Sequence, residues 1–173
     1  EIELGNTPVN GWSFYGSVGY AKSEIQSDLL VQTTDKKVTP NVNYIVPLPT
    51  TGKEMTLTPK YKAGLSAQYE TGAWYTRVKV KYTGKQWATM TNDEEVPAYT
   101  LVGLDAGYQF PNTGFLKKPT LRMSISNLTD RQYRNPSSFN VTNAKDYGTA
   151  RAKTVFYYMG APRFASVTFS ADF

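Results

Sequence analysis

The sequence predicts an all-β protein, an antiparallel sheet whose strands cross a membrane as part of a β-barrel. Three observations support this prediction. Apolar and polar residues alternate with period two along most of the longer segments. Aromatic residues make up 14% of the chain and gather at the ends of these segments. The connections between the segments are unequal in length, and the long and short ones tend to alternate. Together these features are typical of outer-membrane β-barrels.

Alternation places six strands at about 11–22, 60–70, 73–84, 98–110, 119–128 and 162–173, with residues 1–4 as the tail of a seventh. In the first strand, one face carries Trp12, Phe14, Val18 and Tyr20. In the second, the apolar face carries Tyr61, Ala63, Leu65, Ala67 and Tyr69, and the other face Lys62, Gly64, Ser66, Gln68 and Glu70. Thr71-Gly72 then forms a tight hairpin turn.

The four later strands show the same alternation of apolar and polar residues. The third opposes Trp74, Thr76, Val78, Val80 and Tyr82 to Tyr75, Arg77, Lys79, Lys81 and Thr83. The fourth places Val102, Leu104, Ala106, Tyr108 and Phe110 on one face, and the fifth Leu121, Met123 and Ile125. The last opposes Ala165, Val167, Phe169, Ala171 and Phe173 to Phe164, Ser166, Thr168, Ser170 and Asp172.

The connections are a polar loop over 23–59, the Thr71-Gly72 turn, a medium loop over 85–97, a shorter one over 111–118 and a long loop over 129–161. In an up-and-down meander the odd connections all lie at one end. The long loops therefore gather at one end, as the extracellular loops of outer-membrane barrels do, and the short turns at the other.

Strand length separates this interpretation from its alternative, a soluble β-sandwich. A strand of about 11 residues rises roughly 36 Å, which a tilt near 40° reduces to roughly 28 Å, close to the apolar band of membrane barrels. Sandwich strands are mostly about 5–6 residues long. No stretch approaches the roughly 18 apolar residues of a membrane-spanning helix, and Glu1-Ile2-Glu3-Leu4 does not resemble a secretory signal.

The chain contains no histidine and no cysteine. This excludes a Cys/His zinc site, a thiolate nucleophile, a Ser-His-Asp triad and a disulfide framework within these residues. The paired carboxylates Glu94-Glu95 suggest acid–base work, but a solvated, flexible acidic turn is the simpler interpretation. We therefore expect no catalytic residues, no metal ligands and no cofactor, and predict that the protein is not an enzyme.

Five local patterns, in order across residues 57–173, resemble the C-terminal part of TonB-dependent outer-membrane receptors. They are Leu57-Thr58-Pro59-Lys60-Tyr61-Lys62-Ala63, Tyr82-Thr83-Gly84, Val96-Pro97-Ala98-Tyr99-Thr100-Leu101-Val102, Ser126-Asn127-Leu128-Thr129-Asp130-Arg131-Gln132-Tyr133, and Gly160-Ala161-Pro162-Arg163 running to Ala171-Asp172-Phe173. Residues 1–56 fit the strand pattern but contain nothing diagnostic.

The resemblance implies that residues 1–173 are the C-terminal part of a receptor β-barrel domain, the last six or seven strands of a 22-stranded plugged barrel. The plug domain and the TonB box would lie outside this chain. Six strands cannot close a membrane barrel, because the smallest have eight. We therefore expect a piece of a longer receptor, with assembly of three such chains into one barrel as the alternative.

A full-length member would be an active-transport receptor in the outer membrane of a Gram-negative bacterium, taking up a ferric siderophore with energy supplied through TonB. Its other partners would be its own plug domain and remaining strands, outer-membrane lipid and the barrel assembly machinery. Uptake of cobalamin, haem or an oligosaccharide, and a barrel without a transport role, remain as alternatives. A soluble domain that stacks nucleic acid on its aromatics is disfavoured, because the aromatics alternate away from Arg77, Lys79 and Lys81.

The candidate ligand-binding residues lie in the lumen wall and the loops: Lys81, Trp87, Arg151, Tyr157, Tyr158 and Arg163. Cations and aromatics at a loop mouth suit a planar, anionic ligand. The alternatives are that the wall cations are solvated or paired, and that the aromatics pack loops or form girdles. The apolar face of the last strand resembles the signal read by the assembly machinery, and comprises Ala165, Val167, Phe169, Ala171 and Phe173.

Overall fold

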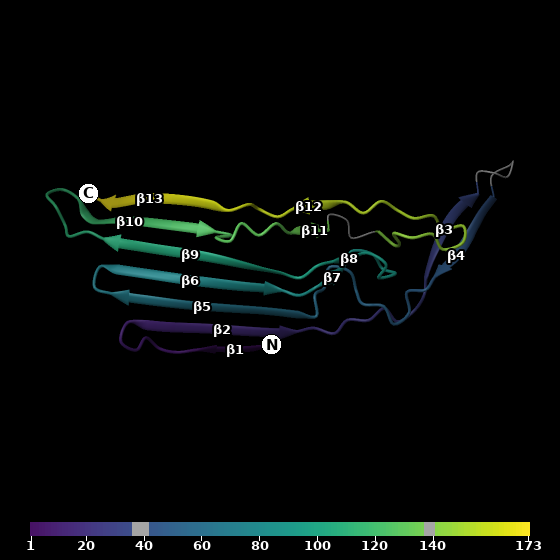
Figure 1. Cartoon of the computed structure of the whole chain (residues 1–173), viewed down its shortest axis with the longest axis horizontal. Helices are drawn as coiled ribbons and strands as arrows, with labels where there is room; N and C mark the ends of the chain where they lie inside the picture. The colour runs from purple at the N-terminus through teal and green to yellow at the C-terminus, as the bar shows by residue number, and fades with distance from the viewer. Residues whose placement is uncertain (36–41, 137–140) are drawn as a thin grey trace.

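The computed structural model describes residues 1–35, 42–136 and 141–173. They form seven antiparallel strands of one sheet, in the order β1-β2-β5-β6-β9-β10-β13, and three small hairpins (Figure 1). The sheet strands are β1 (Ile2–Gly5), β2 (Trp12–Tyr20), β5 (Tyr61–Thr71), β6 (Trp74–Thr83), β9 (Tyr99–Gln109), β10 (Lys117–Ser126) and β13 (Phe164–Asp172). The hairpins pair β3 (Leu29–Asp35) with β4 (Val42–Leu48), β7 (Gln86–Trp87) with β8 (Glu95–Val96), and β11 (Arg134–Pro136) with β12 (Tyr157–Met159).

The predicted all-β fold and all six predicted strands are confirmed, each to within about two residues at either end. The segment expected as the tail of a seventh strand is β1, which pairs with β2 from Ile2↔Val18 to Gly5↔Tyr15. Sequential strands are neighbours throughout the sheet, as in a meander. No helix among the described residues has the length and apolar character needed to cross a membrane.

The register gives the sheet two faces of opposite character. One row joins Leu65, Val80 and Val102 across β5, β6 and β9, and continues the predicted apolar alternation. The adjacent row, one residue along, joins Ser66, Lys79 and Gly103. Because successive side chains of a strand point to opposite faces, every strand contributes to both. We call these the apolar face and the polar face.

Aromatic rings border the apolar face at both ends of the strands. At the end with the short turns, Trp12 lies 4.9 Å from Tyr69 and Trp74 lies 4.8 Å from Tyr108, between ring centroids. At the opposite end the rings of Tyr20 and Tyr61 are 5.3 Å apart. Amphipathic rings at these two levels are the pattern of the interfacial girdles of a membrane barrel.

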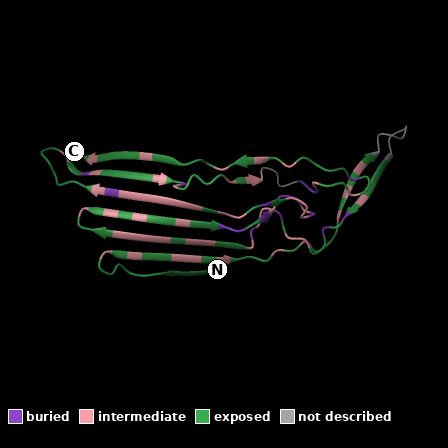
Figure 2. Cartoon of the chain, in the orientation of Figure 1, coloured by how far each residue is buried: buried purple, intermediate pink, exposed green. Residues whose placement is uncertain are grey.

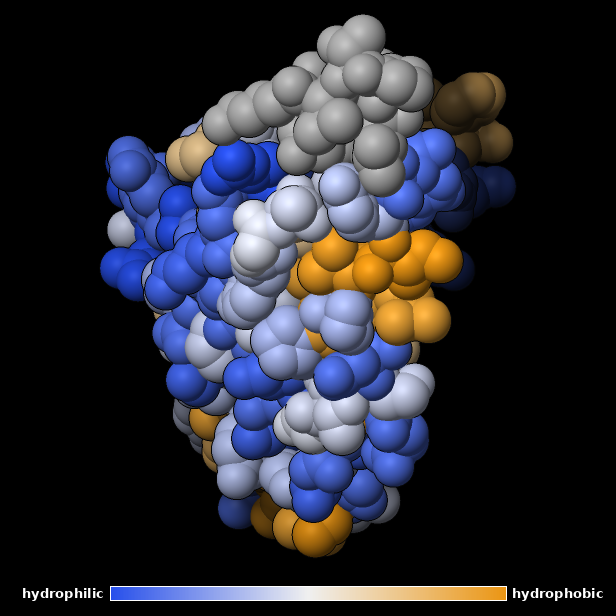
Figure 3. Space-filling view, turned by 90° about the vertical axis from the view of Figure 1, so that its right-hand side faces the viewer, coloured by the Kyte–Doolittle hydropathy of each residue, from blue (hydrophilic) through white to orange (hydrophobic). Residues whose placement is uncertain are grey.

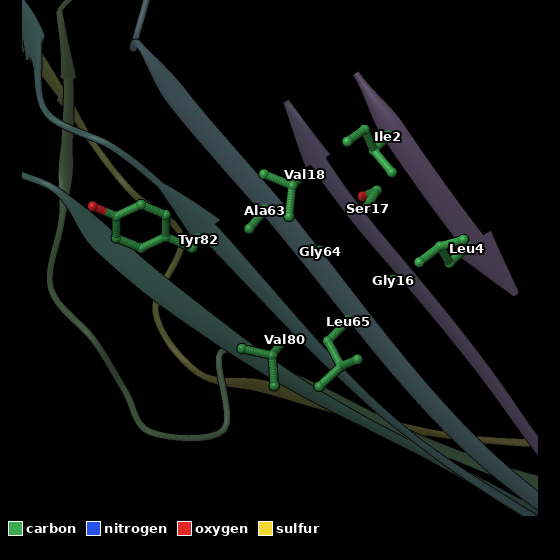
Figure 4. Close-up of a pocket in the computed structure, with 10 residues that line it drawn as sticks. All are labelled: Ile2, Leu4, Gly16, Ser17, Val18, Ala63, Gly64, Leu65, Val80 and Tyr82. Carbon is green, nitrogen blue, oxygen red and sulfur yellow. The ribbon is translucent and has the colours of Figure 1, made fainter. Parts of the chain in front are cut away.

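Between the two aromatic borders the apolar face has a hollow of about 320 Å³ (Figure 4). Ile2 and Leu4 of β1, Leu65 of β5 and Val80 of β6 line it, and Gly16 leaves room at its floor. These large aliphatic side chains on β1 and β5 are more than half exposed. Exposure of these side chains to water would be unfavourable, whereas contact with the hydrocarbon of a membrane would be favourable.

Buried side chains are concentrated at the long-loop end of the sheet (Figure 2). The described segments at this end, residues 21–35, 42–60, 84–98, 127–136 and 141–163, form what we call the loop layer. In the part of the chain that the structure describes, the buried hydrophobic side chains all belong to it: Leu48, Ala88, Val96, Val141 and Ala150. The molecule therefore has its packed core in the loops.

The long connections predicted as loops are more regular than expected. Residues 23–59 contain the β3–β4 hairpin, with seven register pairs from Leu29↔Leu48 to Asp35↔Val42. Residues 85–97 contain β7 and β8, and residues 129–161 contain β11 and β12. The predicted short connection over 111–118 is correct except at its end, where β10 begins at Lys117.

Candidate functional site

The loop layer is organised around the turn at 89–94, which joins the two neighbouring loops. The Asn92 side chain accepts a hydrogen bond from the Glu54 N–H at 2.7 Å and donates one to the Glu54 carbonyl at 2.9 Å. On its other side, Met90 and Thr91 donate backbone hydrogen bonds to the carbonyls of Val141 and Thr142. The turn is thus tied to the first long loop and to the last one.

Asp93 is the most heavily bonded acid of this turn. Its carboxylate accepts hydrogen bonds from the Thr89 hydroxyl at 2.6 Å and from the backbone N–H groups of Ala144 and Lys145 at 2.9 Å each. Partial burial would by itself raise the pKa of Asp93, but these hydrogen bonds outweigh it and hold the pKa below its usual value. Asp93 is therefore ionised at neutral pH and fixes a loop some 50 residues away.

Glu94 and Tyr157 form a second tie between the same loops. The Tyr157 hydroxyl donates a hydrogen bond of 2.5 Å to Glu94 Oε1, and the Arg134 guanidinium lies 4.4 Å from the centroid of the Tyr157 ring. Burial, followed by the hydrogen bond to Glu94, raises the pKa of Tyr157 to about 12. The expectation that Glu94-Glu95 is a solvated, flexible turn is wrong for Glu94, because its carboxylate has a half-buried partner. Glu95 is exposed and pairs with Lys85 at 2.8 Å.

The segment resembling the Asn-Leu-x-Asp motif closes the last loop at its base. Asn127 is buried, and its side chain accepts from the Arg131 N–H at 2.8 Å and donates to the carbonyls of Arg131 and Ala161. Asp130 Oδ1 accepts from the Arg163 N–H at 2.9 Å. The motif residues therefore hold the start of the loop against its return to β13.

The polar face of the sheet carries a hollow of about 490 Å³ lined by charged side chains, Arg77, Lys79 and Arg122 among them. Lys79 forms an ion pair with Asp105 at 2.7 Å, and Asp105 also accepts from the Ser124 hydroxyl. Arg77 Nε donates to the side-chain amide oxygen Oε1 of Gln68 at 2.6 Å. The basic wall expected from the sequence is therefore partly neutralised by its own neighbours.

The six predicted ligand-binding residues are distributed over the wall and the loop layer. Lys81 lies on the polar face of β6, two residues before the last residue of the strand. Trp87 lies in β7, with Lys85 Nζ 5.3 Å from its ring centroid. Arg151 is exposed and pairs with Asp146 at 2.9 Å.

The other three lie on the return of the last loop. Tyr157 is engaged with Glu94, whereas Tyr158, its neighbour in β12, is 68% exposed. Arg163 precedes β13 and is exposed. Within the described residues, no hydrogen bond or ion pair joins any two of the six. The structure thus places Lys81 in the wall and the other five in the loop layer, but it forms no single cluster from the set.

Sequence reasoning missed the residues that organise the layer, namely Asn92, Asp93 and Arg134. The Asn92-Asp93 pair was visible as a turn signal, since such side chains bond local backbone. Its partners at 54 and at 141–145 are distant in sequence, so the pattern did not indicate them. Figure 3, which looks onto the loop end, shows a largely hydrophilic surface interrupted by hydrophobic patches.

The strand proposed as an assembly signal is β13, at the edge of the sheet beside β10. Ala165, Val167 and Phe169 pair with Ile125, Met123 and Leu121 on the apolar face. Beyond them Phe173 is 96% exposed. Among the described residues, no three Asp or Glu side chains are arranged to hold a metal ion.

Comparison with known proteins places these features in a family. The sequence profile described as "TonB dependent receptor-like, beta-barrel" matches residues 1–128. The ferrioxamine receptor of Yersinia enterocolitica is 32% identical over 127 residues, which cover 70% of this chain and 16% of that receptor.

Two solved structures share the fold. The siderophore receptor PiuA from Acinetobacter baumannii aligns over 95% of this chain with a TM-score of 0.66 and 20% identity. The ferric citrate transporter FecA, in its unliganded form, aligns over 91% with a TM-score of 0.58 and 19% identity. This chain spans about a fifth of each of these two proteins and about a sixth of the ferrioxamine receptor. The chain belongs to the family of TonB-dependent receptor-like β-barrels.

Proposed function

We propose that this chain is the C-terminal part of the barrel domain of an outer-membrane transport receptor that takes up a ferric siderophore with energy supplied through TonB. Ferrioxamine is the first candidate cargo, because the relative with 32% identity is a ferrioxamine receptor. The plug domain, the TonB box and the remaining strands belong to the rest of the receptor. The outer membrane of a Gram-negative bacterium is its location.

The observation that carries this proposal is the two-faced sheet with a packed loop layer at one end. The apolar face and its aromatic borders suit lipid, and the polar face suits the lumen of a plugged barrel. A loop layer with its own buried core supplies a preorganised surface at the barrel mouth. Preorganisation lowers the ordering cost of ligand capture.

Within this function, the roles of five of the six candidate residues follow from their surroundings. Tyr158 and Arg151, exposed in the loop layer, and Lys81, at the mouth of the wall, would contact ligand. Trp87 and Tyr157 would support the surface from within the layer. The β13 side chains Ala165, Val167, Phe169, Ala171 and Phe173 would serve as the signal for the barrel assembly machinery.

The test is iron uptake by cells that carry the complete receptor as their sole route for the cargo. Radioactive iron supplied as ferrioxamine should accumulate in cells with TonB and remain at background in cells without it. Uptake of haem, cobalamin or an oligosaccharide in place of ferrioxamine would overturn the assignment of ferrioxamine as the cargo. Uptake that is independent of TonB, or a receptor found outside the outer-membrane fraction, would overturn the proposal itself.

A further inference from the structure

A pocket of about 220 Å³ lies at the base of the loop layer, where β9 begins and the last loop leaves β10. The residues that matter for its chemistry are two tyrosines, two arginines and a glutamine: Tyr99, Tyr133, Arg131, Arg134 and Gln132. None of the six candidate ligand residues lines it. It is separate from the hollow on the polar face, which has different lining residues.

The aromatic wall of this pocket is built in a fixed position. The rings of Tyr99 and Tyr133 stack with 4.4 Å between centroids and an angle of 27° between planes. Tyr133 lies against Gly160 so closely that a Cβ there would be 2.2 Å from the ring. The Tyr99 hydroxyl donates to Asn135 Oδ1 at 3.4 Å. The tyrosines therefore form a rigid support rather than a mobile surface.

The lining of the pocket includes two arginine residues and no Asp or Glu. Asp130 and Glu94 lie outside this lining, where Asp130 accepts from the Arg163 N–H and Glu94 accepts from the Tyr157 hydroxyl. Over the described ranges, the ion pairs include neither Arg131 nor Arg134. Arg134 is nevertheless positioned, because its guanidinium lies over the Tyr157 ring. Within the described residues, the lining of this pocket thus contains two cationic residues and no acidic one.

We propose that this pocket binds an anionic oxygen group, a phosphate or a carboxylate, between Arg131 and Arg134. A planar guanidinium matches such groups with two parallel hydrogen bonds. Whole small-molecule ligands occupy pockets of about 300–1,000 Å³, so this smaller pocket takes one anionic group and not an entire ferric chelate. Two sources carry that chemistry: the phosphate of a lipid in the surrounding leaflet, and an acidic group on a ligand arriving at the loops.

Only the second source rests on the proposed transport function, so binding is measured separately from uptake. The complete receptor is purified in detergent as wild type, as R131Q/R134Q, and as K145Q/K153Q. The control removes the same charge from the same loop at two exposed lysines outside the pocket. The retention of folded-barrel mobility on gels shows that each variant has folded.

The probes are a diphosphorylated glycolipid, its dephosphorylated form, and ferric citrate as a carboxylate-bearing chelate. We expect R131Q/R134Q to weaken binding of one anionic probe at least tenfold while K145Q/K153Q stays within about twofold of wild type. Loss confined to the phosphorylated lipid identifies a lipid site, and loss confined to ferric citrate identifies a ligand site. Equal losses in both variants, or no loss for either probe in R131Q/R134Q, overturn the proposal. If the receptor binds the anionic probe but shows no TonB-dependent uptake, the anion site is supported and only the proposed transport function is refuted.

Discussion

In the seven-stranded sheet, large apolar side chains such as Leu65 and Val167 are exposed, whereas in the loop layer Leu48 and Val96 are fully buried. The usual arrangement of a soluble protein, a packed sheet with open loops, is reversed. The sheet lacks a covering layer because its apolar face is suited to lipid, while the loops must be stable in water by their own packing. The two regions are therefore suited to different surroundings, lipid for the sheet and water for the loops, and each should respond to different mutations.

Asp93→Ala should produce the largest effect and confine it to the loop layer. It leaves the N–H groups of Ala144 and Lys145 without their acceptor, at about 1–3 kcal/mol for each unsatisfied group. Faster hydrogen exchange and proteolysis at 141–153, with unchanged exchange in β5 and β6, is the expected result. Equal loosening of loops and sheet would show that the two regions are not independent.

Leu65→Lys should act on the sheet alone. Leu65 lies near the middle of β5 on the apolar face, where a lysine facing lipid costs about 2–4 kcal/mol. The matched control is Ser66→Glu, one residue along and on the polar face, where the new charge lies opposite Lys79. The free energy of unfolding in lipid bilayers should fall for the first variant and change little for the second. Similar losses in both would argue against a lipid-facing side.

Tyr157→Phe should weaken the loop layer by about 1.5–3 kcal/mol, the range for a hydrogen bond to a charged group. The pKa of Tyr157 is raised to about 12 from an ordinary value near 10, so the protonated form is favoured in the folded state. Its contribution is complete below pH 10 and is lost as the pH rises through 12. Hydrogen exchange of the loops should therefore accelerate over that range in wild type, and a Tyr157→Phe variant with the same profile would exclude this tie.

Glu95→Gln should have the smallest effect. It removes the exposed ion pair with Lys85, and such pairs contribute about 0–1 kcal/mol. Loop protection and unfolding should remain within error of wild type in moderate salt. A loss comparable to that of Asp93→Ala would mean that surface charge, and not the buried hydrogen bonds of the 89–94 turn, holds the layer.

The sequence predicted the sheet well because alternation is a local signal. A strand with one face in lipid repeats every second residue, so Tyr61 to Thr71 could be recognised without knowledge of its neighbours. The β3–β4 hairpin was missed because Thr33, Thr34 and Pro47 make its strands look like a polar loop. Its regularity comes from pairing, not from an alternating pattern.

The candidate site was harder to predict because its organisation is not local. Asp93 meets Ala144 only when two loops pack together, and Glu94 meets Tyr157 across 63 residues. Tyr157 was predicted as a ligand contact because it is an aromatic residue in a loop with several cations, and its hydrogen bond to Glu94 could not be inferred from that pattern. Exposure and charge could be inferred for Arg151 and Tyr158, but which loop residues share a surface depends on pairings that the sequence does not encode locally.

If the sheet is the wall of an outer-membrane barrel, its apolar face contacts lipid and its polar face lines the lumen, and this arrangement can be tested directly. The chain contains no cysteine, so once any cysteines elsewhere in the complete receptor have been replaced, single cysteines introduced at 62–69 can be probed one at a time in native membranes. Reactivity should alternate along the strand. Cysteines at the positions of Ala63, Leu65 and Ala67 should react with a lipid-soluble reagent, and those at Lys62, Ser66 and Gln68 with a water-soluble one. Uniform reaction with the water-soluble reagent along the strand would contradict it.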